Sequence, residues 1–172
     1  MKRHVVLVGL PGVGKTTVGK LVAERLGAPF VDTDAVIVRK MQMPVSRIFA
    51  EHGEQRFRQM EREAGQQALA GPPAVIAPGG GWVAQPGALE AAAEVAFLVY
   101  LRTMALTAAK RAGGGDVRPL LVGEDPVERM RQLLREREPF YLKAACEVKA
   151  DVKSATALAD EIAQLARERA GW

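Results

Sequence analysis

Short apolar runs rich in valine, isoleucine and leucine recur along the chain and predict buried β-strands. The first three runs are followed by Gly9, Asp32 and Pro78, residue types that commonly end a strand. The predicted strands cover residues 5–8, 29–31, 74–77, 95–101 and 147–149.

Between these runs, apolar residues recur at helical spacing. In residues 17–26, Val18, Leu21 and Val22 share one helical face, and Gly27 is placed to end the helix. The predicted helices cover residues 17–26, 34–41, 53–69, 88–93, 105–112, 126–137 and 157–169.

The alternation of strands and helices predicts an α/β fold, with a parallel sheet of about five strands and helices on both faces. In sheets of this kind, ligands bind beyond the carboxyl ends of the strands. We therefore expect the chemistry of this chain to lie after Val8, Val31 and Ala77.

The composition is that of a globular protein. The chain has 172 residues, 48% hydrophobic and 26% charged, which predicts one domain with a substantial core. No apolar run approaches the roughly 20 residues of a membrane span, and residues 1–3 lead into a strand rather than a signal peptide. The one cysteine, Cys146, excludes an internal disulfide and a cysteine-based metal site. We expect a cytoplasmic monomer without a membrane partner.

The net charge of +4 and the pI near 9.5 raise the question of nucleic acid. The basic residues are spread along the chain and interleaved with acids, as in residues 135–138, and no aromatic stacking motif accompanies them. Small anionic ligands explain the excess at least as well. Nucleic acid is therefore not expected as a partner.

The most informative motif is Gly-Leu-Pro-Gly-Val-Gly-Lys-Thr at residues 9–16, a complete phosphate-binding loop of the pattern G-x-x-x-x-G-K-[ST]. A predicted strand precedes it and a predicted helix follows, as the motif requires. Its glycines allow the backbone to wrap around an anion. Lys15 can reach the β- and γ-phosphates, and the Thr16 hydroxyl can ligate Mg²⁺. The motif predicts binding of a nucleoside triphosphate.

Two acidic residues, Asp32 and Asp34, follow the second predicted strand. Beside a phosphate loop, Asp32 is well placed to hold Mg²⁺, directly or through water. Asp34 lies two residues on, on the same face, and can reach the group that accepts the phosphoryl. The alternative is an ordinary helix N-cap, since aspartate is common before a helix.

Arg58 and Glu61 lie three residues apart on a predicted helix and are close enough to pair. One interpretation is a surface ion pair of little energetic value. The other is that Glu61 holds the guanidinium so that its fork faces a ligand carboxylate.

Two glycine-rich stretches complete the candidate site. Gly79, Gly80 and Gly81 follow the third strand directly and predict a loop that a ligand approaches closely. Residues 113–123 contain Arg118 and predict a mobile lid that brings this arginine to the transferring phosphoryl group. The alternative for that stretch is a solvated loop with one arginine.

Together these motifs resemble the shikimate kinases, small phosphate-loop kinases related to the nucleoside monophosphate kinases. A phosphate loop alone occurs in many kinases, but the combination in this order, over almost the whole chain, is specific. The matching segments are GLPGVGKTT at 9–17, DTD at 32–34, IFAEHGEQRFRQME at 48–61, GGG at 79–81, RPLL at 118–121 and REREPFY at 135–141.

The resemblance implies an enzyme of aromatic amino-acid biosynthesis that uses ATP and Mg²⁺. It would transfer the γ-phosphoryl group of ATP to the 3-hydroxyl of shikimate. It also implies a single kinase domain over residues 1–172, with a substrate-binding region at about 33–61 and a lid at about 112–124.

The resemblance further assigns roles by position. Lys15, Asp34 and Arg118 would be catalytic, with Asp34 on the reacting hydroxyl, and Arg111 would lie against adenine. Thr16 and Asp32 would hold Mg²⁺. The nucleotide would contact Gly12, Val13, Gly14, Lys15, Thr16, Thr17, Arg111 and Arg118. Shikimate would contact Asp34, Arg58, Gly79, Gly80, Gly81 and Arg137.

The chain departs from the family pattern at a few positions. Trp82 follows the glycines where the family commonly has a small residue, and Pro78 precedes them. Residues 151–155 lack the proline often found near the adenine. Trp82 is the departure expected to affect substrate choice, because a large ring beside the glycines would reshape the acceptor pocket.

Two other functions compete with this interpretation. One is a kinase for another acceptor, such as a gluconate-type sugar acid or a nucleotide, against which Asp34 and the two arginines Arg58 and Arg137 argue. The other is a nucleotide-dependent switch that performs no acceptor chemistry. The joint presence of these residues with Arg118 argues against a switch.

Overall fold

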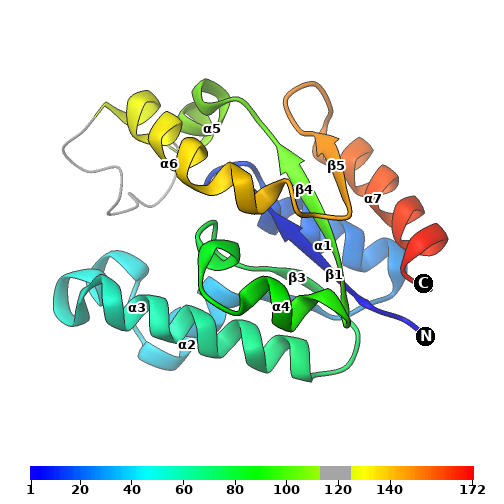
Figure 1. Ribbon diagram of the computed structural model, residues 1–172, viewed down its shortest axis with the longest axis horizontal. Helices are drawn as coiled ribbons and strands as arrows, with labels where there is room; N and C mark the ends of the chain where they lie inside the picture. Colours follow the sequence, from blue (N-terminus) through cyan, green and yellow to red (C-terminus); the bar gives the residue numbers. More distant parts are fainter. Residues whose placement is uncertain (113–124) are drawn as a thin grey trace.

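A wholly parallel sheet of five strands forms the centre of the computed structural model, which describes residues 1–112 and 125–172 (Figure 1). The strand order is β2-β3-β1-β4-β5. This arrangement confirms the predicted fold class. The strands are β1 (His4–Val8), β2 (Phe30–Asp32), β3 (Val75–Ala77), β4 (Ala96–Arg102) and β5 (Cys146–Lys149).

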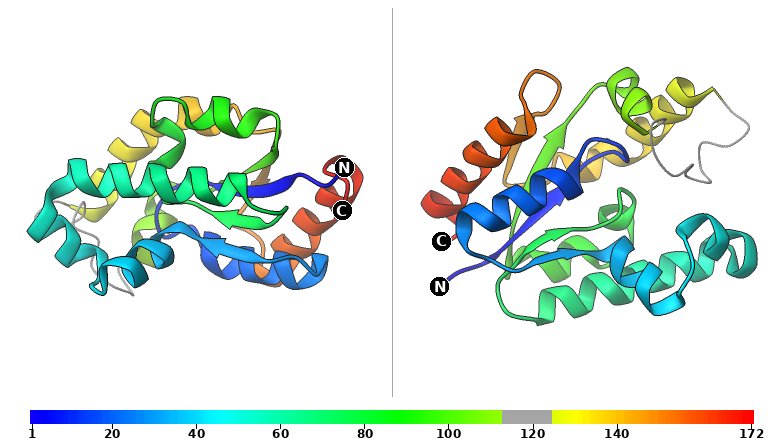
Figure 2. Two further views of the ribbon diagram at one scale, coloured as in Figure 1. Left: turned by 90° about the horizontal axis from the view of Figure 1, so that it is seen from below. Right: turned by 180° about the vertical axis from the view of Figure 1, so that it is seen from behind.

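Helices connect the strands and cover both faces of the sheet (Figure 2). Most of them coincide with the predicted helices to within a few residues. They are α1 (Lys15–Leu26), α2 (Thr33–Met41), α3 (Val45–Ala70), α4 (Ala88–Ala93), α5 (Ala105–Ala112), α6 (Pro126–Tyr141) and α7 (Ala155–Arg169), with a 3₁₀ turn η1 (Trp82–Ala84).

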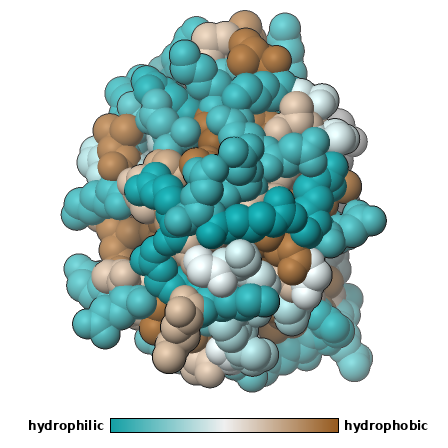
Figure 3. Space-filling view, turned by 90° about the vertical axis from the view of Figure 1, so that its right-hand side faces the viewer, coloured by the Kyte–Doolittle hydropathy of each residue, from teal (hydrophilic) through white to brown (hydrophobic). Residues whose placement is uncertain are grey.

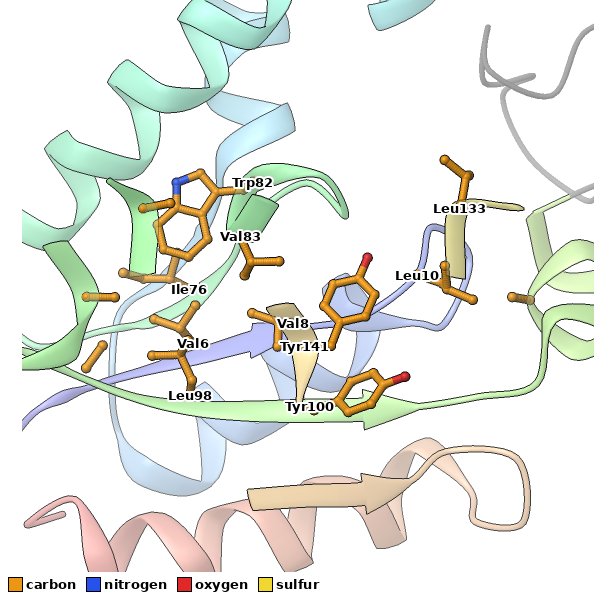
Figure 4. Packing of buried hydrophobic residues seen from close by; sticks show 14 of the residues in the cluster. Val6, Val8, Leu10, Ile76, Trp82, Val83, Leu98, Tyr100, Leu133 and Tyr141 are labelled. Atoms are coloured by element: carbon orange, nitrogen blue, oxygen red, sulfur yellow. The ribbon is translucent and has the colours of Figure 1, made fainter. Parts of the chain in front are cut away.

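The central strand β1 is buried on both faces, which explains its continuous apolar run. Val5 and Leu7 belong to the cluster that packs against α1 and α7. Val6 and Val8 face the opposite side, where the core is formed with residues of α4, α5, α6 and η1 (Figure 4). Successive side chains of a strand point to opposite faces, so each face of β1 supports one helical layer.

Helix α3 differs from the prediction, which began a helix at residue 53. The helix begins at Val45, and Gly53 interrupts it with the left-handed value φ 80°. The first part was missed because it is short, with only residues 45–52 before Gly53. Ile48 anchors it in a small cluster with Ile37 of α2, and this contact is tertiary rather than local.

The polar side chains expected to carry chemistry follow the carboxyl ends of β1, β2 and β3. The predicted lid at about 112–124, with Arg118, lies outside the described residues apart from Ala112, the last residue of α5.

The face of the molecule shown in Figure 3 carries no extended apolar band. Hydrophilic residues predominate on the face shown in Figure 3, and hydrophobic residues occur there in small separate groups. Within residues 1–112 and 125–172, no helix combines the length and the apolar character needed to cross a membrane.

Candidate active site

The phosphate loop turns sharply between β1 and α1. Gly12 and Gly14 have φ values of 78° and 95°, in the left-handed region that favours glycine. A Cβ on Gly12 would also lie 2.8 Å from the carbonyl oxygen of Ala108. Helix α1 begins at Lys15, directly after Gly14 of the loop. The backbone amides of its first turn therefore face the loop, where they attract an anion.

Lys15 begins α1 and folds back over the loop. Its Nζ donates to the carbonyl oxygens of Gly9 and Leu10, each at 2.8 Å. The residue is 8% exposed and lines a cavity of about 330 Å³. Its charge is thus held at the position where a bound phosphate would meet the loop.

The two predicted metal ligands contact each other. The Thr16 hydroxyl donates to Oδ2 of Asp32 at 2.7 Å. Oδ1 of Asp32 accepts from the amide of Ala35 at 3.1 Å, so this carboxylate also caps α2. The two interpretations of Asp32 are therefore compatible. One hydroxyl and one carboxylate oxygen are the hard ligands that Mg²⁺ takes from a protein when phosphates and water complete its octahedron.

Asp34 lies in the first turn of α2 and lines the same cavity as Lys15 and Thr16. Its Oδ1 lies 3.3 Å from the point where a Cβ on Gly79 would be. Asp34 thus stands between the phosphate loop and the glycine loop, separate from the Thr16–Asp32 pair.

Arg58 and Glu61 form the expected ion pair, with Nη1 of Arg58 2.8 Å from Oε2 of Glu61. Glu61 is 1% exposed and Arg58 24% exposed, so this is not a surface pair. The other nitrogen, Nη2, lies 3.5 Å from the exposed Glu54. The buried carboxylate therefore holds the guanidinium against the site.

The three glycines leave room for these side chains. A Cβ on Gly79 would lie 2.0 Å from Oε1 of Glu61, and a Cβ on Gly80 would lie 3.2 Å from Nη1 of Arg137. These positions are glycine because the side chains of Glu61 and Arg137 approach the backbone there. The predicted close approach of a ligand to the same loop stays a prediction.

Arg58 and Arg137 converge at Gly81. A Cβ there would lie 3.0 Å from Nη1 of Arg58 and 3.0 Å from Nη2 of Arg137. Arg137 comes from α6 and is 8% exposed. Within the part of the chain that the structure describes, no carboxylate forms an ion pair with Arg137. A buried cation of this kind calls for an anionic ligand.

Tyr141, one helical turn after Arg137, fixes the glycine loop. Its hydroxyl donates to the carbonyl oxygen of Gly80 at 2.6 Å. Burial raises the pKa of Tyr141 to about 12, against the opposing effect of Arg137. The phenol therefore stays protonated and keeps donating. The ring stacks on Tyr100 at 5.1 Å, as Figure 4 shows.

Arg111 borders the cavity at the end of α5. Its Nη1 lies 3.4 Å from the carbonyl oxygen of Val13, and its Nη2 lies 3.4 Å from that of Ala150 after β5. Nearby, Asp151 accepts from the hydroxyl of Thr103 at 2.5 Å. Burial alone would raise the pKa of Asp151, but the hydrogen bonds it accepts lower it. These contacts connect the phosphate loop to the residues after β5.

The indole of Trp82 does not enter the acceptor side of the site. The residue is 3% exposed and points into the core beside Ile76 (Figure 4). Its Nε1 lies 2.3 Å from where a Cβ on Gly65 would be. The expectation that this ring reshapes the acceptor pocket is therefore wrong, because Gly65 of α3 leaves space for it on the other side.

Two contacts of the site were not foreseen from the sequence: those of Tyr141 and Gln85. The latter donates from Nε2 to Oε2 of Glu61 at 2.7 Å. The predicted contact residues Val13 and Thr17 lie in or beside the phosphate loop, with Thr17 in the wall of the cavity.

Proteins of one known family match this chain over most of its length. The family model described as shikimate kinase matches residues 11–167. The shikimate kinase of Moorella thermoacetica is 43% identical over 162 residues, which cover 94% of this chain and 93% of the relative. That of Thermobifida fusca is 48% identical over 142 residues, 81% of this chain and 80% of the relative.

Solved structures of kinases share the fold of this chain. The shikimate kinase of Acinetobacter baumannii, determined in complex with shikimate, superposes with a TM-score of 0.92 at 34% identity and covers 98% of this chain and 94% of its own. A gluconokinase from Sinorhizobium meliloti superposes with a TM-score of 0.66 at 16% identity, covering 99% of this chain and 94% of its own. The second likeness concerns the fold alone.

Proposed function

Because the chain belongs to the shikimate kinase family, we propose how its side chains perform the transfer that defines this family. The enzyme moves the γ-phosphoryl group of ATP to the 3-hydroxyl of shikimate and releases shikimate 3-phosphate and ADP. This is a step of the shikimate pathway to the aromatic amino acids.

The phosphate loop binds the triphosphate. Lys15 turns from the carbonyl oxygens of Gly9 and Leu10 toward the β- and γ-phosphates and offsets the charge that develops there. Arg111 lies beside the adenine, and Arg118 acts on the transferring group, a role that rests on the sequence resemblance alone. The remaining nucleotide contacts are Gly12, Val13, Gly14, Thr16 and Thr17.

Thr16 and Asp32 hold Mg²⁺ in this proposal. Their oxygens already lie 2.7 Å apart, and Asp32 is fixed by its bond to the α2 backbone. No group of three or more acidic, histidine or cysteine side chains that could hold a metal occurs in residues 1–112 and 125–172. When bound there, Mg²⁺ would supply positive charge that offsets the negative charge of the triphosphate.

The acceptor binds on the other side of the glycine loop. Arg58 and Arg137 hold the shikimate carboxylate from two helices, and the backbone of residues 79–81 lies against the ring. Asp34 orients the reacting hydroxyl and takes its proton as the phosphoryl group arrives. Its position between the phosphate loop and the glycine loop supports this role for Asp34, distinct from the metal-binding role of Asp32.

One observation carries the acceptor assignment: two guanidinium groups flank the same point at Gly81, and one of them, Arg137, is buried without a carboxylate partner among the described residues. Two forks facing one small space suit a carboxylate. A neutral alcohol acceptor would leave the buried Arg137 without an anion, whereas Arg58 would keep only Glu61 and Glu54.

We propose further that the enzyme acts as a monomer in the cytoplasm, with ATP and shikimate as its partners and no nucleic acid. The described site residues converge within a single chain, which supports a monomer that is competent by itself.

An ADP-release assay with a panel of acceptors tests this proposal. ADP should form with shikimate and Mg²⁺ and should fall to background with gluconate, with a nucleoside monophosphate or without an acceptor. Omission of Mg²⁺ should abolish release. Equal turnover with gluconate, or release that is independent of any acceptor, would contradict it.

A further inference from the structure

We infer that Gln85 is a positioning residue for the acceptor site, acting through Glu61 on Arg58. The inference rests on the proposed binding of the acceptor carboxylate by Arg58. Gln85 lies directly after η1, outside the motifs that identify the family.

The three side chains form a relay. Nε2 of Gln85 donates to Oε2 of Glu61 at 2.7 Å, and the same oxygen accepts from Nη1 of Arg58 at 2.8 Å. The second oxygen, Oε1, lies against Gly79, where a Cβ would come within 2.0 Å of it. Glu61 is thus fixed on both sides, and its buried charge faces Arg58.

Arg58 needs this support because its helix offers it a second carboxylate. Glu54 lies one turn before it on α3, with its Oε1 3.5 Å from Nη2 of Arg58, and is 59% exposed. Contact with Glu61 holds the guanidinium at Gly81, whereas a turn toward Glu54 would draw it to solvent. Fixing the Glu61 carboxylate therefore decides where the fork points.

The Gln85 amide is held by its donor end. Its Oε1 is buried and has no hydrogen-bond partner among the described residues. A buried acceptor without a partner lowers stability. The opposite amide orientation would place this oxygen against the Glu61 carboxylate, so the chemistry selects the orientation with Nε2 on Glu61.

A second contact keeps Gln85 in place. Trp82, three residues earlier, lies over Gly65, which is one helical turn after Glu61 on α3. The pairs Trp82–Gly65 and Gln85–Glu61 therefore join the same face of α3 to the same short segment. The amide thus directly follows a 3₁₀ turn that is anchored in the core by the buried side chains of Trp82 and Val83.

The test is Gln85→Met, which keeps the length of the side chain and removes the donor. The KM for shikimate should rise by about three- to tenfold, while the KM for ATP and the melting temperature change little; tenfold corresponds to about 1.4 kcal/mol. Gln85→Glu should act more strongly, because it places a second carboxylate at Glu61. The matched control is Gln59→Met, since Gln59 donates to Glu63 at 3.0 Å on the exposed side of α3.

A double-mutant cycle with Arg58→Ala separates this inference from the proposed function. If Gln85 acts through Arg58, Gln85→Met should have no further effect on the KM for shikimate in the Arg58→Ala background. If Gln85→Met raises the KM for shikimate equally with and without Arg58→Ala, the role of Gln85 is overturned. It is also overturned if Gln85→Met alone leaves this KM unchanged. An unchanged KM for shikimate in Arg58→Ala alone would overturn the acceptor assignment itself.

Discussion

The indole of Trp82 occupies the space in which a side chain at position 65 would lie. A Cβ on Gly65 would fall 2.3 Å from Nε1 of Trp82, which is too close for non-bonded atoms, and 3.0 Å from Cδ1, which is very tight. Gly65 is therefore glycine for a tertiary reason, although it lies inside helix α3. The pair closes the core between α3 and the segment that follows the glycine loop.

This relationship predicts that the effect of Gly65→Ala on the free energy of unfolding has the opposite sign to the one usual in a helix. Alanine normally stabilises a helix interior by about 1 kcal/mol relative to glycine. Gly65→Ala should instead lower the free energy of unfolding, because the overpacked indole costs about 1–3 kcal/mol. In a Trp82→Ala background the same substitution should raise it. Urea denaturation of the four proteins measures both effects, and the same sign in both backgrounds would contradict the interlock.

The fold was largely predictable because local patterns and tertiary packing agree. The apolar run of β1 predicted a strand buried on both faces, and Val5 and Val6 do face opposite helical layers. The first part of α3 was not predictable, since its burial depends on Ile48 meeting Ile37 of another helix. Residue patterns report a segment's own periodicity and not the partner that it meets.

The site shows the same limit. The order of motifs predicted that Asp34, Arg58 and Arg137 serve one acceptor site, and the geometry at Gly79 and Gly81 brings them to one loop. The sequence did not reveal which side of that loop the Trp82 ring takes. The informative residue was Gly65, whose meaning depends on a segment distant in the chain.

The two arginines should control binding of the acceptor. Arg58→Ala and Arg137→Ala should each raise the KM for shikimate much more than that for ATP, since loss of a buried charged partner costs about 2–5 kcal/mol. The effect should be larger at Arg137, which is 8% exposed. Steady-state kinetics with each substrate varied in turn measures the split.

Lysine variants of the two site arginines, and alanine variants of two exposed arginines, complete that test. Arg58→Lys and Arg137→Lys should rescue poorly, because an ammonium lacks the bidentate fork. The exposed residues Arg62 on α3 and Arg135 on α6 serve as matched controls, and their alanine variants should behave as the wild type. If the alanine variants of the two site arginines leave the shikimate KM unchanged, the carboxylate lies elsewhere.

Asp34 should act on the reaction and not on the nucleotide. Asp34→Asn keeps the shape and removes the charge, so kcat should fall by about 10²-fold or more, the usual scale for a general base. The KM for ATP should change little. Asp32→Asn provides the contrast, because loss of its charge should weaken ATP binding at limiting Mg²⁺. A collapse of ATP affinity in Asp34→Asn with kcat retained would move Asp34 to the metal site.

Lys15 should be needed for turnover but not for folding. Lys15→Ala removes the charge that offsets the β- and γ-phosphates, and activity should be nearly abolished. Circular dichroism should stay native, because the side chain faces the cavity. Lys20→Ala, on the exposed side of the same helix, is the control. Activity of Lys15→Ala close to the wild type would reject the phosphate-loop assignment.

His4 connects the first strand to the last turn of α3 and to the segment that follows it. Its Nδ1 accepts from the amide of Ala74 at 3.2 Å, and its Nε2 lies 3.1 Å from the carbonyl oxygen of Leu69. The ring is thus a neutral imidazole with its proton on Nε2. Burial lowers the pKa of His4 below 6.5, against the opposing effect of these two hydrogen bonds.

The lowered pKa of His4 predicts how stability depends on pH. Above 6.5 the imidazole is neutral in both the folded and the unfolded chain, and its hydrogen bonds contribute fully. Below it the unfolded chain binds the proton first, so stability is lost as pH falls through the lowered pKa, by at most about 1.4 kcal/mol per pH unit. His4→Gln keeps one donor and one acceptor and should remove this component of the pH dependence in urea denaturation. His52→Gln, at an exposed position, should retain it. If the difference in stability between the wild type and His4→Gln is the same at about pH 8 and about pH 5, the ring does not titrate in this way.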